Sequence, residues 1–254
     1  MCNIRQKLQE EYIKYHAEDT FATATAQIKA IEFIPENSIV LDIGCGNGTG
    51  KIIADKKGKK IKEYIGIDFH KDTLNKAKNN LDKFINADIE NLAPDLFAQQ
   101  YFDVIMFNDV IEHLVYPQKA LKNLEQYLKD DGIFIMSIPN VSHQSVILNV
   151  LLNGLWYDDG VASKEHLRFF TFSEILNLLE SINFNIVDNV IATTTELHPI
   201  MQNILLSVKS ILNDDFDNRL RQSQVVQYVF KAKKGYNFNQ NFSLEFIPNQ
   251  IIKL

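Results

Sequence analysis

The chain has 254 residues, a net charge of −6, 46% apolar residues and 23% charged residues. These values are typical of a soluble globular protein, and the acidic balance argues against a nucleic-acid partner, because that affinity comes from clustered Lys and Arg. The two cysteines, Cys2 and Cys45, suggest neither a disulfide framework nor a zinc site. The sequence shows no signal peptide and no apolar run long enough to span a bilayer, so we expect a cytoplasmic protein without membrane insertion.

Residues 1–34 have the pattern of an N-terminal helical cap, which ends at Pro35. Short apolar runs then alternate with helical patterns. The predicted strands are 39–43, 62–68, 83–87, 101–108 and 132–138, and the predicted helices are 48–57, 71–80 and 117–129. Near-continuous apolar strands that alternate with helices are typical of a parallel sheet covered on both faces, so we expect a doubly wound α/β fold.

Residues 141–170 lack a strand pattern and contain aromatic residues and two histidines. We interpret them as an acceptor-site insertion over the carboxyl ends of the strands, where such sheets bind ligands. The alternation then resumes with a helix at 172–181, a strand at 184–192, a helix at 195–213 and a final strand at 223–232. Residues 233–254 form a tail without assignment. We expect one domain over 1–254, with its core at 37–192 and a C-terminal part at 193–254.

A glycine-rich loop follows the first predicted strand: Val-Leu-Asp-Ile-Gly-Cys-Gly-Asn-Gly, residues 40–48. Gly44, Gly46 and Gly48 permit positive φ and a close approach of a ligand to the backbone, and the amides of the next helix point at that place. The spacing Gly-x-Gly-x-Gly differs from the Gly-x-Gly-x-x-Gly of dinucleotide-binding loops. The carboxylate of Asp42 repels a pyrophosphate but can accept hydrogen bonds from an ammonium group.

Polar residues end the next three strands. Asp68 is placed to accept both hydroxyls of a ribose, and Phe69 can pack on an adenine face. Asp88, followed by Ile89, can accept from the exocyclic amine of adenine, and Asn108 ends the fourth strand. Either aspartate alone is as readily a helix N-cap, but the two together with the glycine loop favour a nucleoside ligand.

These segments resemble the class I S-adenosylmethionine-dependent methyltransferases over about residues 37–192. The resemblance implies a seven-stranded, mostly parallel sheet with an antiparallel last strand, S-adenosylmethionine as methyl donor and S-adenosylhomocysteine as product. It implies that the loop holds the methionine part of the donor, Asp68 the ribose, Asp88 and Ile89 the adenine, and Asn108 the methyl side. The loop residues concerned are Asp42, Gly44, Cys45, Gly46 and Gly48.

Two further segments are similar to a subgroup that O-methylates small molecules and bacterial surface polysaccharides such as capsule and lipopolysaccharide: Asn108 to Leu114 and Glu165 to Thr171. On a helical turn, Asp109, Glu112 and His113 would face one side, and His166 would approach from the insertion. We expect His113 or His166 to be a general base, with Asp109 and Glu112 beside it; the alternative is an ordinary helix start.

His143 is a weaker candidate for the same base. Asp109, Glu112, His113 and His166 form an alternative site for Mg²⁺ or Mn²⁺, similar to the Glu-x-x-Glu-His turn of metal-dependent O-methyltransferases. Aspartate at the first position departs from that pattern.

Three residues of the insertion are candidates for contact with the acceptor. The guanidinium of Arg168 can bind a phosphate or carboxylate of the acceptor. The alternative is that Arg168 forms an ion pair with Glu165 or Glu174. Trp156 and Tyr157 are either an acceptor wall or part of the core.

The preferred function is methyl transfer to an oxygen of a sugar, a nucleotide-linked sugar or a phosphorylated metabolite. The alternatives are N-methylation of an amino sugar or amine, O-methylation of a quinone-type phenol, and, with less weight, a nicotinamide-dependent oxidoreductase or a non-catalytic S-adenosylmethionine-binding protein. The partner is a small-molecule acceptor, which the sequence does not name, and the oligomeric state is left open.

Overall fold

The computed structural model describes residues 22–71, 76–154, 157, 160–235 and 242–253. Its strands are β1 (Ala22–Ala24), β2 (Ser38–Ile43), β3 (Ile61–Asp68), β4 (Lys83–Asn86), β5 (Phe102–Asn108), β6 (Leu128–Pro139), β7 (Phe184–Thr194), β8 (Val225–Lys234), β9 (Ser243–Pro248) and β10 (Ile251–Lys253). Its helices are α2 (Thr25–Glu32), α3 (Thr49–Lys56), α5 (Pro117–Glu125), α6 (Gln144–Leu148), α7 (Phe172–Ser181), α8 (Pro199–Ser207), α9 (Lys209–Leu212) and α10 (Phe216–Gln224), with the short turns η1 (Ile89–Asn91), η2 (Ile111–His113), η3 (Asn149–Asn153) and η4 (Asn213–Asp215).

Eight strands form the main sheet in the order β4-β3-β2-β5-β6-β8-β7-β9. All neighbouring pairs are parallel except those of β8, which runs antiparallel to both β6 and β7. The chain order reverses between β2 and β5, where a doubly wound sheet opens a crevice at the carboxyl ends of its strands. The expected doubly wound, mostly parallel α/β fold is therefore confirmed.

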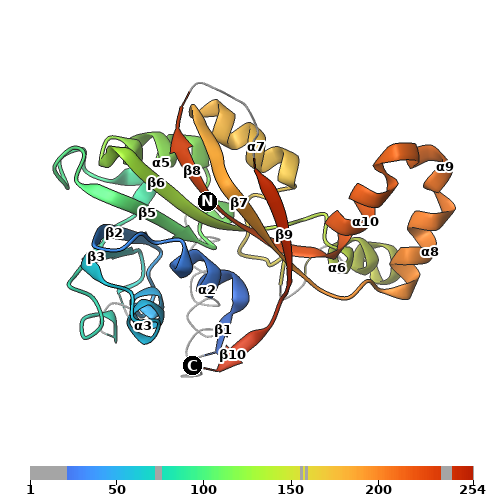
Figure 1. Cartoon of the computed structure of the whole chain (residues 1–254), viewed down its shortest axis with the longest axis horizontal. Coiled ribbons are helices and arrows are strands. Elements are labelled where there is room, and N and C mark those ends of the chain that lie inside the picture. Colours follow the sequence, from blue (N-terminus) through green and yellow to red (C-terminus); the bar gives the residue numbers. More distant parts are fainter. Residues whose placement is uncertain (1–21, 72–75, 155–156, 158–159, 236–241, 254) are drawn as a thin grey trace.

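Two apolar cores cover the two faces of the sheet, because strand side chains alternate between faces. On one face, α5 and α7 bury residues such as Leu121 and Leu178 against Phe107 and Phe134. On the other face, α2 and α3 bury Ile31 and Ile53 against alternate residues of the strands. Figure 1 shows these two helix layers on opposite sides of the sheet.

The sheet has one strand more than the seven expected. The additional strand, β9, comes from the unassigned tail and pairs in parallel with β7 at the edge of the sheet. A second pairing joins β1 and β10, so residues 22–24 are extended rather than helical as expected. Residues 1–21 and part of the expected helix 71–80 lie outside the described residues.

The expected helix 195–213 is also wrong in detail. The chain forms α8 and α9 there, and then an unexpected helix, α10. These helices and α6 form a lobe that projects from the sheet (Figure 1), and its small core contains Leu148, Met201, Leu205 and Phe216. Among the described residues, no helix has the length and apolar character that crossing a membrane requires.

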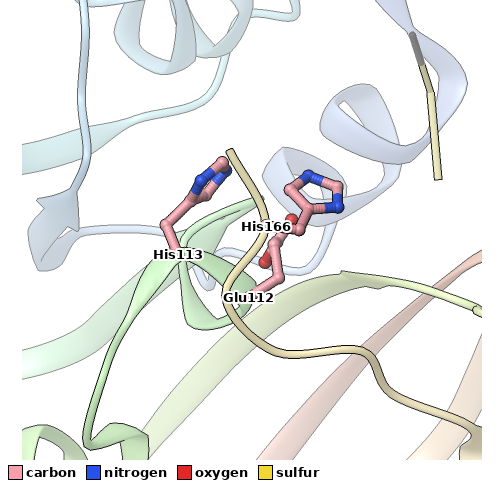
Figure 2. Close-up of side chains that lie close together, drawn as sticks. All are labelled: Glu112, His113 and His166. Atoms are coloured by element: carbon pink, nitrogen blue, oxygen red, sulfur yellow. The ribbon is translucent and has the colours of Figure 1, made fainter. Parts of the chain in front are cut away.

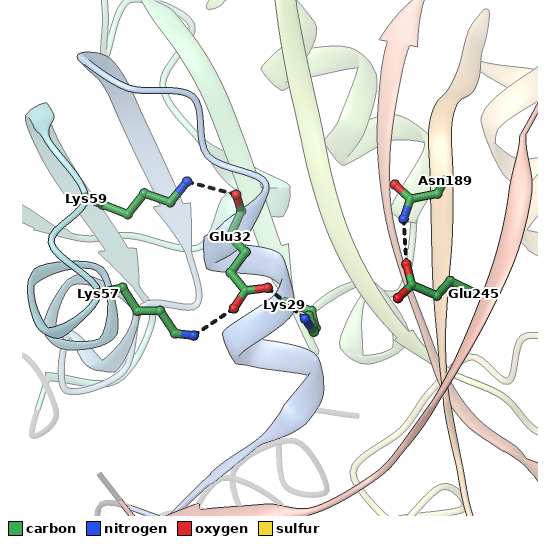
Figure 3. A network of polar contacts seen from close by, with 6 residues as sticks. All are labelled: Lys29, Glu32, Lys57, Lys59, Asn189 and Glu245. Atoms are coloured by element: carbon green, nitrogen blue, oxygen red, sulfur yellow. Dashed lines mark hydrogen bonds and ion pairs between the residues drawn. The ribbon is translucent and has the colours of Figure 1, made fainter.

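A polar network fixes α2 against the end of α3 (Figure 3). The Glu32 carboxylate accepts from Lys29 at 2.9 Å and from Lys57 at 2.7 Å, and its backbone carbonyl accepts from Lys59 at 2.8 Å. On the far edge of the sheet, Asn189 of β7 donates to Glu245 of β9 at 3.0 Å. These contacts hold both the N-terminal helix and the additional strand in place.

Candidate active site

The glycine loop turns sharply at the carboxyl end of β2. Gly44, Gly46 and Gly48 all have positive φ, at 69°, 52° and 81°. The amides of Gly44 and Cys45 donate to the carbonyl of Ile67 on β3, which fixes the loop to the neighbouring strand. A Cβ at Gly44 would overlap the side chain of Val110, whereas a Cβ at Gly46 would meet no atom within 4 Å. The backbone at Gly46 thus borders open space, where a ligand can approach.

Asp42, the penultimate residue of β2, is almost completely buried, with 3% of its surface exposed. Its Oδ2 accepts a hydrogen bond of 2.8 Å from the hydroxyl of Tyr64. Burial raises the pKa of Asp42 to about 7; the Tyr64 hydrogen bond opposes this shift and the charge of Asp68 adds to it. Burial likewise raises the pKa of the Cys45 thiol, which keeps this cysteine neutral.

Asp68 links the second strand to the glycine loop. Its Oδ2 accepts from the amide of Gly46 at 2.8 Å, and its Oδ1 accepts from the amide of His70 at 2.7 Å. The Asp68 carboxylate therefore caps the turn after β3 and also holds the glycine loop in place.

The residues expected beside an adenine lie around the next strand end. Asp88 is the N-cap of η1, where it accepts from the amide of Glu90 at 3.0 Å, which fits the cap alternative. Ile89 is buried, and the ring of Phe69 is 45% exposed, as a stacking surface must be.

Asn108 and Asp109 occupy the end of β5. The Oδ1 of Asn108 is buried without a hydrogen-bond partner among the described residues. Asp109 has φ 55°, so the backbone turns left-handed here, and the expected helical turn begins only at Ile111. Its Oδ1 accepts from Ser137 at 2.9 Å and from Gln227. Burial raises the pKa of Asp109 to about 6. Asp109 therefore does not share a helical turn with Glu112 and His113, although its charge still acts on Glu112.

Glu112, His113 and His166 do come together, as Figure 2 shows, with the carboxylate between the two rings in this view. Their potential ligand atoms lie within 4.8 Å of one another. Glu112 is 1% exposed, and neither of its carboxylate oxygens has a hydrogen-bond partner among the described residues. Burial, and then the charge of Asp109, raise the pKa of Glu112 well above its usual value.

Each imidazole is oriented by a backbone carbonyl. The Nδ1 of His113 lies 3.1 Å from the carbonyl of Glu165, and the Nδ1 of His166 lies 2.9 Å from that of Val161. A carbonyl only accepts, so Nδ1 carries the proton in both rings, and Nε2 of the neutral ring keeps its lone pair. The rings meet edge to face, with their centroids 4.9 Å apart.

Residues 161–168, which we call the strap, hold His166 against the turn η2. The amides of Leu167 and Arg168 both donate to the carbonyl of Glu112, at 2.8 and 2.9 Å. The guanidinium of Arg168 donates to the carbonyl of Val115, beyond the same turn. Arg168 therefore anchors the strap, and neither of the ion pairs expected for it is the contact found here.

The other expected acceptor-side residues lie elsewhere. His143 is buried and is the N-cap of α6, with its two ring nitrogens each 2.8 Å from a hydroxyl, of Ser145 and of Thr195. It is not part of the group with Glu112. Tyr157 is 50% exposed, so the core alternative does not hold for it. Trp156 lies outside the described residues.

Sequence reasoning missed the partners that other strands supply. Ser137 of β6 and Gln227 of β8 orient Asp109, and Tyr64 of β3 binds Asp42. Only the pairing and register of the strands reveal these contacts. The single available signal was chemical, because a polar residue inside an apolar strand needs a hydrogen-bond partner.

Comparison with known proteins identifies the class. The sequence profile of the family described as a methyltransferase domain matches residues 34–204. The chain is 26% identical to a ubiquinone biosynthesis O-methyltransferase of Coxiella burnetii, over 66% of this chain and 71% of that protein. It is also 37% identical to the ribosomal protein L11 methyltransferase of Thermosipho africanus, but only over 39% of this chain and 36% of that protein.

Solved structures agree with this family. An S-adenosylmethionine-dependent methyltransferase of Archaeoglobus fulgidus superposes with a TM-score of 0.57 over 82% of this chain and 92% of that one, at 16% identity. The chain belongs to the methyltransferase-domain family, and it is an S-adenosylmethionine-dependent methyltransferase with the class I fold.

Proposed function

We propose that the chain transfers the methyl group of S-adenosylmethionine to an oxygen atom of a small-molecule acceptor. The observation that carries this proposal is the group of Glu112, His113 and His166, whose potential ligand atoms lie within 4.8 Å of one another. A neutral amine attacks a methyl carbon unaided, whereas a hydroxyl is a poor nucleophile and needs a base or a metal ion. A carboxylate with two imidazoles beside the carboxyl edge of the sheet therefore favours an oxygen acceptor.

The proposed donor site is the crevice above β2 and β3. Asp42 would receive the ammonium group and Asp68 the ribose hydroxyls, and the exposed ring of Phe69 would stack on the adenine. Asn108 would line the methyl side. Three observations support this assignment: the open space at Gly46, the exposure of Phe69 and the oxygen of Asn108, which has no partner among the described residues.

In the proposed reaction the acceptor oxygen forms a bond to the methyl carbon while the bond from carbon to sulfur breaks, and S-adenosylhomocysteine leaves. The proton of the acceptor hydroxyl goes to Nε2 of His113 or His166. The carbonyls of Glu165 and Val161 hold both rings in the tautomer that this step requires. The strap keeps His166 close to η2 and shields Glu112 from water.

The same three side chains also fit a divalent cation. The Glu112 carboxylate is buried, and neither of its oxygens has a partner among the residues that the structure describes. Together with two imidazoles it makes a nitrogen-rich donor set, which suits Mn²⁺ better than Mg²⁺. A bound cation would supply Lewis acidity that lowers the pKa of the acceptor hydroxyl. Asp109, which the sequence had included in this set, is held instead by Ser137 and Gln227.

The class of acceptor remains a prediction. The relative named for ubiquinone biosynthesis supports an oxygen acceptor and the phenol alternative. Sugars, nucleotide-linked sugars and phosphorylated metabolites for capsule or lipopolysaccharide synthesis rest on the sequence motifs alone.

The proposal can be tested with isotopically labelled S-adenosylmethionine and three acceptor panels: catechols, nucleotide-linked sugars and amines. We expect label in a methyl ether, and at least about 100-fold lower kcat for Glu112→Gln. Glu174→Gln, at an exposed position of α7, is the control and should behave as wild type. Chelation followed by Mn²⁺ then separates the metal from the base: restored turnover assigns a metal, and unchanged turnover assigns the histidines. Methylation confined to amines would refute the proposal.

A further inference from the structure

Tyr64 occupies an unusual place for a hydroxyl. It lies in the middle of β3, is fully buried, and its hydroxyl donates to Oδ2 of Asp42 on the adjacent strand at 2.8 Å. The residues that follow it on β3 are mainly apolar: Ile65 and Ile67 fill the core on the other face of the sheet. A tyrosine at such a position costs free energy unless its hydroxyl has a partner. Asp42 is that partner.

Gly50 provides the space for this hydrogen bond. It lies in the first turn of α3, just after the glycine loop. A Cβ at this position would overlap the Tyr64 hydroxyl and would lie 2.9 Å from Oδ2 of Asp42. Any other residue at position 50 would therefore displace the hydroxyl or the carboxylate. The absent side chain of Gly50 and the buried tyrosine together define one orientation of Asp42.

We propose that Tyr64 is a positioning residue: in the space left by Gly50, its hydroxyl fixes the Asp42 carboxylate in the orientation that receives the ammonium group of the methyl donor. This inference rests on the proposed donor site. The Tyr64 hydroxyl binds Oδ2 of Asp42, and the proposal assigns Oδ1 of Asp42 to the ligand.

The hydrogen bond also favours the ionised form of Asp42. Burial raises the pKa of Asp42 to about 7, Tyr64 lowers it, and the charge of Asp68 raises it further. Cys45 also faces Asp42 but is neutral, because burial raises the pKa of its thiol. The pKa of Tyr64 lies well above 10, through burial and then the charge of Asp42, with smaller effects of Cys45 and Asp55, so Tyr64 always donates.

The experiment is calorimetric titration of the full chain with S-adenosylhomocysteine between about pH 6 and about pH 9. For Tyr64→Phe we expect about tenfold weaker binding at neutral pH, and a loss of binding on acidification that begins at higher pH than in wild type. Gly50→Ala should disturb the same hydrogen bond, because the new Cβ would overlap the Tyr64 hydroxyl. It should therefore shift the pH profile of binding in the same direction.

Tyr101→Phe is the matched control, because its hydroxyl also donates to a carboxylate, that of Glu63 at 2.5 Å, near the start of β3. It should leave both the affinity and the pH profile unchanged. Wild-type affinity and profile in both Tyr64→Phe and Gly50→Ala would overturn the inference while leaving the proposed function in place. No binding of S-adenosylhomocysteine to the wild-type protein at any pH would overturn the proposed donor site itself.

Discussion

At the scale of single residues, Glu112 has the most demanding environment. Its carboxylate is buried and has no hydrogen-bond partner in the described part of the chain, so the anion is unstable and the pKa of Glu112 is raised. An adjacent cation relieves the cost, whether it is a protonated imidazole or a metal ion. Because both imidazoles lie beside it, Glu112 can favour the charged form of whichever histidine has taken a proton.

His166→Asn tests whether these histidines take part in the reaction. We expect kcat to fall by at least about 100-fold, since a positioned base contributes that much, while the thermal midpoint stays near that of wild type because the ring is only half-buried.

His198→Asn is the control for that variant. His198 is the N-cap of α8 and accepts from the amide of Ile200; Asn is itself a good N-cap, so both stability and kcat should stay near wild type. Full turnover of His166→Asn in a steady-state assay would remove this ring from the mechanism.

At the scale of elements, α2 depends on charge as well as on its apolar face. Burial raises the pKa of Glu32, but hydrogen bonds and charges of Lys57 and Lys29 outweigh that effect and hold the pKa below its usual value of 4.5. Because the folded pKa is lowered, the stabilisation is present above about pH 4.5 and is lost as the pH falls through the folded pKa.

Glu32→Gln should therefore lower the free energy of unfolding at neutral pH by up to about 1 kcal/mol, the range measured for partly exposed ion pairs. Urea denaturation at neutral pH and near pH 3 measures it, and the difference from wild type should be smaller at the lower pH. Asp215→Asn removes an ion pair with Arg219 on the exposed surface of the lobe and is the control. Equal effects of both substitutions at neutral pH would contradict a special role for Glu32.

At the scale of the whole molecule, buried acids give the unliganded protein an unusual dependence on pH. The folded state raises the pKa of Asp42 to about 7 and of Asp109 to about 6, and raises that of Glu112 as well. Between about pH 4 and about pH 7 the folded chain binds more protons than the unfolded chain at these sites. The free energy of unfolding therefore falls as the pH rises, because ionising these carboxyls costs more in the folded chain.

We expect the thermal midpoint of the unliganded protein to decrease from about pH 5.5 to about pH 8. Differential scanning fluorimetry measures this slope, and Asp42→Asn should make it shallower because one of the acids is removed. A midpoint that rises over the same interval would show that these carboxyls are ionised in the folded protein throughout.

Sequence reasoning was strongest where a motif depends on local chemistry. The apolar run of β2, the glycines after it, the acid that ends β3 and the acid two residues after β4 depend on local sequence alone, so the fold and the candidate donor site could be predicted from them. Strand β9 gave little signal because most of its residues are exposed at the edge of the sheet. The left-handed conformation of Asp109 was missed because the predicted helical turn began at Asp109, whereas the turn begins at Ile111. Asn and Asp tolerate the left-handed conformation better than most residues.

Contacts between distant segments could not be predicted. Gln227 reaches Asp109 only because β8 enters the sheet in antiparallel register beside β6, with Ser137 opposite Val229. The strap reaches Glu112 across more than fifty residues by backbone hydrogen bonds, which any sequence can form. Side-chain patterns carry no information about either contact.

The placement of β8 has a consequence for biosynthesis. Within the described residues, β7 pairs with β8 and β9, and both of these strands follow it in the chain. While the ribosome is still translating residues before Val225, a nascent chain exposes both edges of an eleven-residue strand. Such edges readily pair with other chains. We therefore expect that synthesis interrupted in this interval gives a fragment prone to aggregation, until β8 has been synthesised and pairs with β7.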